Sequence, residues 1–406
     1  MRIAEFTDTF LPIVDGVGRV VHNYAVFLSG MGHECYVMTP MNDTGYRGGY
    51  PFELVEYIGM QVPGLPQYRA GVPSLDTHYN NRLRQIQLDV VHGHSPFAAG
   101  REALRQSVRF NVPLIGSFHT KYYDDFYKIA KSEDLAYIGV KYVVEFYNQC
   151  DQVWSVSKHA ADTLRAYGFK GDIIVLENGV PIRTPEPEAA KEMGERLGLG
   201  DLPVLLYVGQ INWKKNILRT MEAASLLKKD GKRFKLVLVG RGPDSEQVLE
   251  KARELGIDEE VMLPGMIQND RELNGLYHRA SIFAFPSLYD TAGLVVREAA
   301  VMETPSLVID GSAPSERIVP GINGLVCEDT TESMYEVLTH YLFNAEELKR
   351  LGQNARTSIP VSWEEAIVPI ARQYGEVTRR WKQQSKEKNV HAVSRAYDRF
   401  KNRLGT

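Results

Sequence analysis

The sequence predicts an α/β protein built from two doubly wound, Rossmann-like domains that face each other across a cleft. Short apolar runs alternate with longer helical patterns, which is typical of parallel strands joined by crossover helices. The chain has 406 residues, too many for one ordinary core. A polar stretch with Pro181, Pro185 and Pro187 divides the runs into two series. Ligands of such domains bind at the carboxyl ends of the strands, so we expect the site there.

The composition is that of a soluble globular protein. Hydrophobic residues make up 44% and charged residues 24%, which excludes disordered, collagen-like and disulfide-rich classes. The net charge of −4 argues against nucleic acid as a partner. No apolar run approaches the roughly 18 residues of a membrane span. The opening MRIAEFTD carries acidic residues where a signal peptide is apolar. We therefore expect a cytoplasmic protein, with peripheral contact to the inner face of the plasma membrane left open.

The first series predicts an N-terminal domain over residues 1–182. Helices are expected at 20–31 and 98–110, and Gly32 ends the first of them. The strands are expected at 3–6, 35–38, 90–92, 114–118, 152–156 and 173–176.

A linker over 183–200 leads to a second domain over 201–362, and the segment 363–406 lacks strand signals and is expected to be helical. The strands of the second domain are expected at 204–208, 235–239, 281–285, 306–309 and 324–327.

The most informative motif is PSLYDTAGLVVREAAVMETP, which follows a predicted strand. Ala292 and Gly293 open a helix, whose free N–H groups form an anion site. Asp290 lies in the loop before that helix, and Glu298 lies about one and a half turns into it, where a carboxylate can bind a diol such as ribose. The alternative, a capping aspartate and a surface glutamate, stays open on spacing alone.

Two further turns follow strands of the second domain. In LLYVGQINWKKN, Lys214 and Lys215 precede a helix, where a lysine can neutralise a diphosphate. Solvated lysines are the alternative. In LVLVGRGPD, Arg241 lies between two glycines at the carboxyl end of the next strand.

The N-terminal domain offers a glycine loop and three histidines. Gly16 and Gly18 follow the first strand, in a pattern that is poor as a dinucleotide fingerprint and fits a loop touching a ligand. His92, His94 and His119 end strands; a metal site from the His-x-His pair lacks a third local ligand. We expect His92 to be a packing residue and His119 to have a functional role.

Together these stretches resemble the retaining GT-B glycosyltransferases of family 4, which use nucleotide-sugars. The resemblance covers nearly the whole chain and rests on motifs in matching order. These are FTDTFLPIVDGVGRVV, HGHS, SFHT, ENGV, VGQINWKKN, VGRGP, the Asp290–Glu298 motif and GINGLV. Within the family, the opening and SFHTKYYDDF are most similar to bacterial diacylglycerol glucosyltransferases.

The resemblance implies a role for each matching residue of the second domain. Glu298 would bind the donor ribose, Asp290 would face the donor sugar, and Lys215 would pair with the diphosphate. The backbone N–H groups that would hold sugar or diphosphate are those of Ala292, Gly293 and Leu294.

The remaining implied contacts come from both domains. Met266 and Ile267 would contact the base, Gly16 would lie beside the phosphate, and His119 would lie near the reacting centre. The resemblance also implies that the C-terminal helix crosses back to the N-terminal domain. It implies a hexose, glucose by the narrower match, transferred to a lipid or small-molecule acceptor. Family frequency favours a uridine diphosphate donor, and no residue of the sequence excludes GDP or ADP. No cofactor is expected, and no metal, since the sequence has no Asp-x-Asp motif.

Two positions depart from the family pattern. Asp290 stands where the family has glutamate, and Gln210 stands where the family has arginine. The shorter carboxylate and the missing cation leave the donor sugar open, with Lys214 or Arg241 as compensating charges. The alternatives are therefore a transferase with a soluble acceptor, a nucleotide-sugar epimerase and a non-catalytic sugar-nucleotide sensor.

The C-terminal tail is strongly basic. Residues 379–406 carry a net charge of +7, with aromatic and aliphatic residues interleaved at helical spacing beyond 390. Such a helix can lie on an anionic membrane surface, and a solvated face is the alternative.

Overall fold

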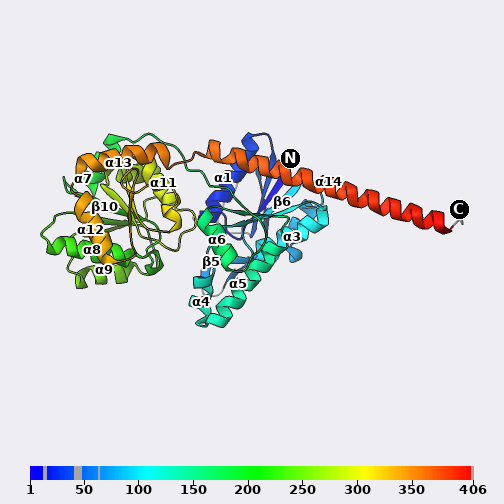
Figure 1. Cartoon of the computed structure of the whole chain (residues 1–406), viewed down its shortest axis with the longest axis horizontal. Coiled ribbons are helices and arrows are strands. Elements are labelled where there is room, and N and C mark those ends of the chain that lie inside the picture. The colour runs from blue at the N-terminus through cyan, green and yellow to red at the C-terminus, as the bar shows by residue number, and fades with distance from the viewer. Residues whose placement is uncertain (12–15, 41–47, 63–64, 404–406) are drawn as a thin grey trace. The chain divides into compact units, whose positions relative to one another are not determined.

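The computed structural model describes residues 1–11, 16–40, 48–62 and 65–403, and it describes their side chains except at 62–68 and beyond 385. The chain divides into two compact units. Unit 1 comprises residues 1–156, 161–176 and 364–406, and unit 2 comprises 157–160 and 177–363. Each unit is a parallel sheet with helices on both faces (Figure 1), which confirms the predicted α/β class with two doubly wound sheets.

Unit 1 has a seven-stranded sheet in the order β3-β2-β1-β6-β7-β8-β9, all parallel. Its strands are β1 Arg2–Phe6, β2 Glu34–Pro40, β3 Glu53–Tyr57, β6 Val90–Gly93, β7 Leu114–Phe118, β8 Gln152–Ser155 and β9 Ile173–Val175. A separate antiparallel pair consists of β4 Gly59–Val62 and β5 Leu65–Gly71. The sequence did not predict β3, because Glu53 and Glu56 interrupt its apolar pattern at the edge of the sheet.

Helices cover the sheet of unit 1. They are α1 Gly16–Gly30, α2 Thr77–Arg82, α3 Ala98–Phe110, α4 Tyr123–Ala130, α5 Glu133–Asn148, α6 Lys158–Ala166 and, from Glu364 on, α14 Trp363–Arg403. The C-terminal helix thus packs on the N-terminal sheet: Ile370 and Tyr374 are fully buried, and the Trp381 indole N–H donates to the Asn111 carbonyl at 3.0 Å. Among the described residues, no helix combines the length and apolar character of a membrane span.

Unit 2 has a six-stranded parallel sheet in the order β12-β11-β10-β13-β14-β15. Its strands are β10 Val204–Val208, β11 Lys235–Val239, β12 Val261–Gly265, β13 Ile282–Phe285, β14 Ser306–Ile309 and β15 Leu325–Cys327. Its helices are α7 Pro187–Arg196, α8 Ile217–Lys229, α9 Ser245–Glu254, α10 Asp270–Arg279, α11 Leu294–Val301, α12 Thr331–Tyr341 and α13 Ala345–Ser358. The central strands are fully buried, as their near-continuous Val and Leu content requires.

The stretch 183–200, expected as a linker, instead contains α7, which is part of unit 2. Pro187 begins the helix, and Ala189, Ala190 and Met193 form its buried face. Arg271 at the start of α10 bonds Glu192 on α7. The prolines that suggested a linker therefore mark the entry to a packed helix, because proline fits the first helical turn.

Candidate functional site

The strand order of unit 2 changes direction between β10 and β13. From β10 the chain moves outward through β11 and β12, and it then returns to place β13 on the other side of β10. The loops at the carboxyl ends of two such strands diverge, and the crevice between them is where α/β sheets bind ligands. Lys215 follows β10 and Asp290 follows β13, so the two predicted residues flank this position.

A short helix after β10 holds Lys215 in place. This helix, η2 Trp213–Lys215, begins with the Asn212 side chain accepting from the Lys214 N–H at 3.0 Å. The Trp213 N–H donates to Asp244 Oδ2 at 2.9 Å, which fixes the turn to the start of α9. The sequence analysis did not single out Asn212 or Asp244. Asparagine before a lysine-rich turn is the signal that was available, because its side chain caps such a turn.

Lys215 and Asp290 form an ion pair with Nζ and Oδ2 at 2.8 Å. Their side chains are 16% and 25% exposed, so solvent can reach both groups. The Tyr289 ring lies close to both lysines. Its centroid is 5.1 Å from the Lys214 ammonium group and 5.2 Å from that of Lys215. This geometry gathers two cations at one aromatic ring, which stabilises their charges. Tyr289 was not predicted.

Gly293 connects the Asp290 loop to α11. Its φ of +56° is left-handed, and a Cβ there would lie 2.9 Å from Pro314 Cα, so a side chain does not fit. The helix that starts at Leu294 directs its first N–H groups toward this loop, which favours an anion there. Glu298 lies one turn into α11, half-buried, and the Tyr277 hydroxyl donates to its Oε2 at 3.3 Å. Ala292 and Leu294 are also half-buried.

The remaining predicted residues of unit 2 also follow strands. Gln210 and Arg241 have exposed side chains after β10 and β11, and the Arg241 carbonyl accepts from the Ile211 N–H at 3.2 Å. Met266 and Ile267 follow β12; Met266 is 41% exposed, whereas Ile267 packs partly on the core. Gly240 allows these turns to approach, since a Cβ there would lie 1.8 Å from the Gly209 carbonyl oxygen.

A buried arginine between the two motif carboxylates was missed by the sequence analysis. Arg297 is 6% exposed, and its Nη1 donates to the Asn178 carbonyl at 2.8 Å. Glu177 lies 3.6 Å from its Nη2 and also bonds Arg317. Burial lowers the pKa of Arg297, and the Glu177 charge opposes that shift. The ENGV motif thus anchors α11 and holds the neighbouring Glu298 in place.

A second set of polar residues lies at the corresponding reversal in unit 1, between β1 and β6. Glu5 is fully buried, and its Oε2 lies 2.7 Å from His94 Nε2. His94 Nδ1 lies 3.0 Å from Nε2 of His119, which is 7% exposed. The Tyr374 hydroxyl of α14 donates to Glu5 Oε1 at 2.8 Å. We call Glu5, His92, His94, His119 and Tyr374 the buried histidine network.

The network fixes which nitrogen of His119 carries a hydrogen. A carboxylate only accepts, so His94 Nε2 carries a hydrogen and donates to Glu5. When His94 is neutral, its Nδ1 accepts from the Nε2–H of His119, and Nδ1 of His119 is an acceptor. The bonds from Glu5 through His94 therefore orient the His119 ring.

Burial and charge set the protonation states of the network. Burial would raise the pKa of Glu5, but the charges and hydrogen bonds of His92 and His94 outweigh it and lower the pKa to about 2. Burial, together with the His94 charge, lowers the pKa of His92 to about 4. Burial also lowers the pKa of His119 well below its usual value. At neutral pH, Glu5 is thus an anion and both histidines are neutral.

The same residues have the spacing of a metal site. Ligand atoms of Glu5, His92 and His94 lie within 4.8 Å of one another. Each of these atoms already has a protein partner, and His92 bonds Ser117 Oγ at 2.8 Å and the Tyr374 hydroxyl. The geometry thus describes a satisfied network, in line with His92 as a packing residue.

Gly16 is the first residue of α1 and has open space around it. Most of the loop that was expected to touch phosphate, at 12–15, lies outside the described residues.

Two family models together match most of the chain. Residues 14–184 match the model described as Glycosyltransferase Family 4, and residues 190–358 match Glycosyl transferases group 1. An alpha-monoglucosyldiacylglycerol synthase of Streptococcus pneumoniae is 28% identical over 352 residues, which are 82% of this chain and 75% of the relative. A GDP-mannose-dependent alpha-mannosyltransferase of Corynebacterium glutamicum is 24% identical over 343 residues, 81% of this chain and 77% of the relative.

The fold is also similar to solved structures. Anabaena HepE in complex with UDP and glucose superposes with a TM-score of 0.74 at 15% identity, covering 93% of this chain and 100% of that chain. This likeness concerns the fold.

The buried histidine network predicts that unit 1 loses stability in mild acid. An unfolded histidine binds its proton at about pH 6.5, whereas His92 binds it near 4. Between these values the unfolded chain holds more protons, so lowering the pH favours unfolding, by roughly 3 kcal/mol across the window. We expect the protection factors of the β6 amides, which correct for slower intrinsic exchange in acid, to fall from pH 6.5 to 4.

The control for this prediction is a histidine outside the network. His92→Asn lowers stability at pH 7 but should flatten its dependence on pH, while His340→Gln, at an exposed position of unit 2, should retain the wild-type slope. An unchanged slope in His92→Asn would contradict the assignment.

Proposed function

This chain belongs to the GT-B glycosyltransferases, with a family 4 domain followed by a group 1 domain, and we propose that it transfers glucose from UDP-glucose to diacylglycerol with retention of configuration. The observation that carries the proposal is the Lys215–Asp290 pair at the strand reversal of unit 2, next to the start of α11. A cation, a carboxylate and helix N–H groups lie together there, which supports a sugar diphosphate as the ligand.

The residues of unit 2 divide the donor between them. The diphosphate takes the place of Asp290 as the partner of Lys215, and the N–H groups of Ala292, Gly293 and Leu294 bind its oxygens. Glu298 binds the ribose hydroxyls. Asp290, released from the lysine, accepts from the hydroxyls of the sugar. Met266 and Ile267 lie beside the base. Arg241 supplies a positive charge that the neutral side chain of Gln210 does not.

The reaction breaks the bond between the sugar C1 and the diphosphate oxygen. The acceptor hydroxyl oxygen attacks C1 from the face that the diphosphate leaves, and its proton passes to the departing phosphate. Negative charge grows on that phosphate, where Lys215 and the helix N–H groups stabilise it without reorganisation. We propose that these groups replace a metal ion, and that His119 positions the reacting sugar through its ring nitrogen.

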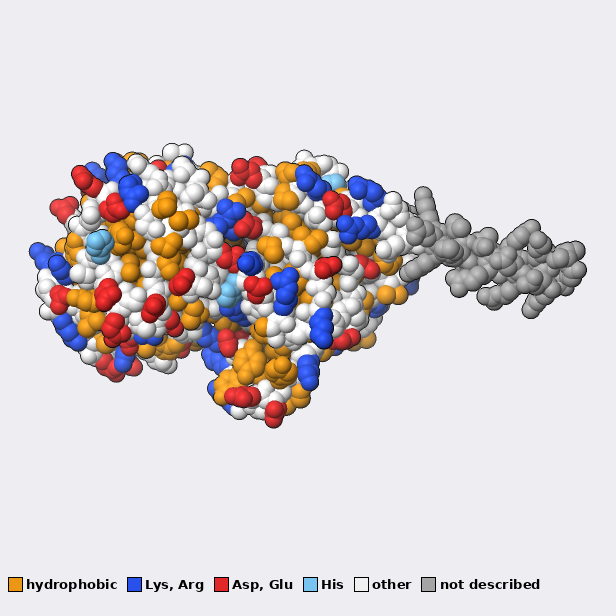
Figure 2. Space-filling view, viewed as in Figure 1, with side chains coloured by type: hydrophobic (Ala, Val, Ile, Leu, Met, Phe, Trp, Pro, Cys, Tyr) orange, Lys and Arg blue, Asp and Glu red, His pale blue; other side chains and the backbone are white. Residues whose placement is uncertain are grey.

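The acceptor assignment rests on a relative and on an apolar surface. The pneumococcal relative is a monoglucosyldiacylglycerol synthase by name. In this chain, α4 begins four residues after His119. The helices α4 and α5 expose apolar side chains to solvent, which Figure 2 shows on the lobe of unit 1 that they form. The exposed set comprises Tyr127, Ile129, Leu135, Tyr137, Ile138 and Tyr142. An apolar surface of this kind suits acyl chains. We therefore propose that the enzyme is cytoplasmic and contacts the membrane peripherally.

A transferase that moves mannose to another acceptor is the second candidate, since the corynebacterial relative is a GDP-mannose-dependent mannosyltransferase. Incubation with UDP-glucose, GDP-mannose and ADP-glucose, each with diacylglycerol or a soluble sugar acceptor, separates the two. The proposal expects an α-linked glucosyl lipid from UDP-glucose alone. Product formed only from GDP-mannose would replace the proposal with the second candidate.

The first prediction for this site concerns Glu298. Replacing it with Gln keeps the shape of the side chain but removes the charge that the ribose hydroxyls would meet. We expect the donor KM to rise and kcat/KM to fall by about 10²-fold, the scale of a lost charge-assisted hydrogen bond. Tyr277→Phe, which removes the hydroxyl that donates to Glu298 Oε2, should cost less. Unchanged kinetics in Glu298→Gln would contradict the ribose assignment.

The second prediction concerns Lys215 and metal ions. Lys215→Ala should lower kcat by about 10²–10³-fold, because a preorganised charge at the leaving group is lost. Lys214→Ala is the matched control: Lys214 lies over the same Tyr289 ring but is not the lysine assigned to the diphosphate, so a smaller loss is expected. Wild-type activity should survive EDTA. Activity abolished by EDTA and restored by Mg²⁺ or Mn²⁺ would refute this account.

A further inference from the structure

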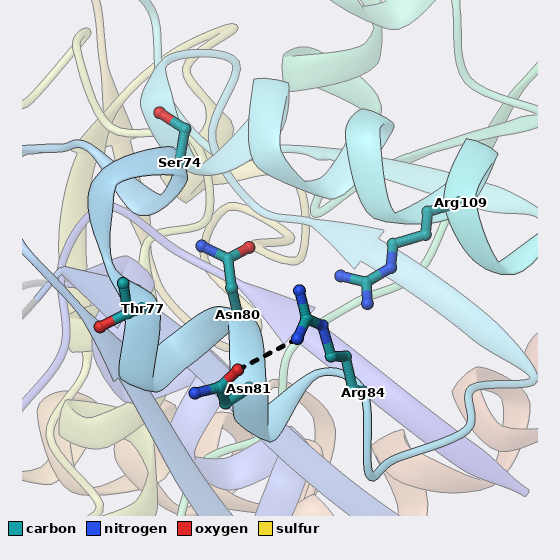
Figure 3. A pocket seen from close by; sticks show the side chains of 6 residues that line it. All are labelled: Ser74, Thr77, Asn80, Asn81, Arg84 and Arg109. Atoms are coloured by element: carbon teal, nitrogen blue, oxygen red, sulfur yellow. Dashed lines mark hydrogen bonds between the residues drawn. The ribbon is translucent and has the colours of Figure 1, made fainter.

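A polar hollow in unit 1 lies outside the residues assigned to the reaction. It has a volume of about 360 Å³ and lies where the segment around α2 meets the last turn of α3 (Figure 3). Its lining consists of Ser74, Thr77, Asn80, Asn81, Arg84 and Arg109. The lining thus offers hydroxyls, amides and two guanidinium groups, and among the residues that the structure describes it includes no carboxylate. We call it the α2–α3 pocket.

The two arginines make this pocket electrostatically unbalanced. Figure 3 shows the Arg84 and Arg109 side chains reaching toward the same hollow from two different elements. Arg84 bonds the Asn81 amide oxygen at 3.4 Å, and Arg109 lies over the Phe110 ring at 5.5 Å. Among the described residues, neither arginine forms an ion pair with a carboxylate. Neighbouring arginines do: Arg82 pairs with Glu53 and Arg105 with Glu102.

Guanidinium groups with amides and hydroxyls beside them match the oxygens of a phosphate group. Arginine binds phosphate through two parallel N–H bonds, and asparagine and serine supply further donors. An anion in the hollow would also relieve the repulsion of the two like charges.

The surroundings of the pocket distinguish a lipid phosphate from a free one. Leu75, next to Ser74, is 73% exposed, and Val108, next to Arg109, is 74% exposed. These are the two most exposed large apolar side chains among the described residues. A basic pocket whose lining residues are followed or preceded in the sequence by exposed apolar side chains suits a surface that meets the headgroups and the acyl boundary of a bilayer.

The basic tail leaves unit 1 near the same end of α3. The Trp381 indole N–H donates to the carbonyl of Asn111, the residue that ends α3 after Arg109 and Phe110. Lys382 lies 4.0 Å from Asp89. Most of the +7 charge of residues 379–406 follows this point in the sequence. An anionic surface that meets the pocket would therefore also attract the tail.

We propose that the α2–α3 pocket binds the phosphate of an anionic lipid headgroup and so holds the enzyme on the membrane. This site is separate from the donor residues of unit 2 and from His119. Binding to vesicles needs neither donor nor acceptor. The lipid-binding proposal can therefore fail while the transferase proposal stands, and the transferase proposal can fail while the lipid-binding proposal stands.

The test is sedimentation of the full chain with vesicles of phosphatidylglycerol and phosphatidylcholine, against vesicles of phosphatidylcholine alone. The chain should sediment only with the anionic vesicles, and less as salt rises. The double variant Arg84→Ala and Arg109→Ala should bind them about 30-fold more weakly, from roughly fivefold for each arginine at an anionic surface. The matched control is Arg233→Ala with Arg253→Ala, two exposed arginines of unit 2, which should bind like wild type.

Competition with inorganic phosphate separates the two sources of the anion. Millimolar phosphate, at constant ionic strength, should displace wild-type chain only weakly, because it lacks the apolar contacts. Equal losses in the pocket and control variants would overturn the proposal in favour of general charge attraction. Wild-type chain that ignores anionic vesicles, but whose melting temperature phosphate raises only when Arg84 and Arg109 are present, would overturn the lipid assignment and leave a free-phosphate site.

Discussion

In both units the candidate residues depend on one feature of the doubly wound parallel sheet. The strand order changes direction once, next to the strand that comes first in the sequence of that sheet. At that reversal two loops separate, and side chains from distant parts of the sequence can meet without a strand or helix between them. In unit 2 the reversal brings Lys215 to Asp290, and in unit 1 it brings Glu5 to His94. The two pairs differ in burial. The Lys215–Asp290 pair is partly exposed to solvent, so a ligand can replace Asp290 as the partner of Lys215. The Glu5–His94 pair is fully buried, so groups of the protein itself balance the charge of Glu5.

The enclosed pair explains why the C-terminal helix belongs to the N-terminal unit. Glu5 is an anion without access to water, so its oxygens need donors. His94 supplies one and Tyr374, more than 360 residues later in the chain, supplies another. The hydroxyl of Tyr374 also bonds His92. The polar core of unit 1 is therefore completed only when α14 docks, which links the end of the chain to the orientation of His119.

The sequence allowed the fold to be predicted, and it singled out Lys215, Asp290 and Glu298 as candidate donor residues, because both leave local signals. Most central strands are continuous apolar runs, and the glycines of the strand-to-helix turns follow them directly. The contacts that hold these residues were not predictable, because they join distant positions. Arg297 bonds Asn178, and Glu5 bonds Tyr374, and no spacing reveals either pair. The edge strand β3 was missed because its half-buried glutamates interrupt the apolar pattern. The helix α7 was missed because prolines signal both a linker and a helix start.

The departures from the family pattern acquire a physical meaning at the Lys215–Asp290 pair. Aspartate reaches Nζ of Lys215 at 2.8 Å, so the lysine is engaged before any donor arrives. The central claim is that a nucleoside diphosphate displaces Asp290 from Lys215. Calorimetric titration of UDP, with GDP in parallel, into wild type and Asp290→Asn tests it most directly. The account predicts that one of the two diphosphates binds Asp290→Asn several-fold more tightly than wild type, because a partly exposed ion pair no longer competes, and that Lys215→Ala loses this gain. Equal affinity of wild type and Asp290→Asn for the diphosphate that binds would contradict it.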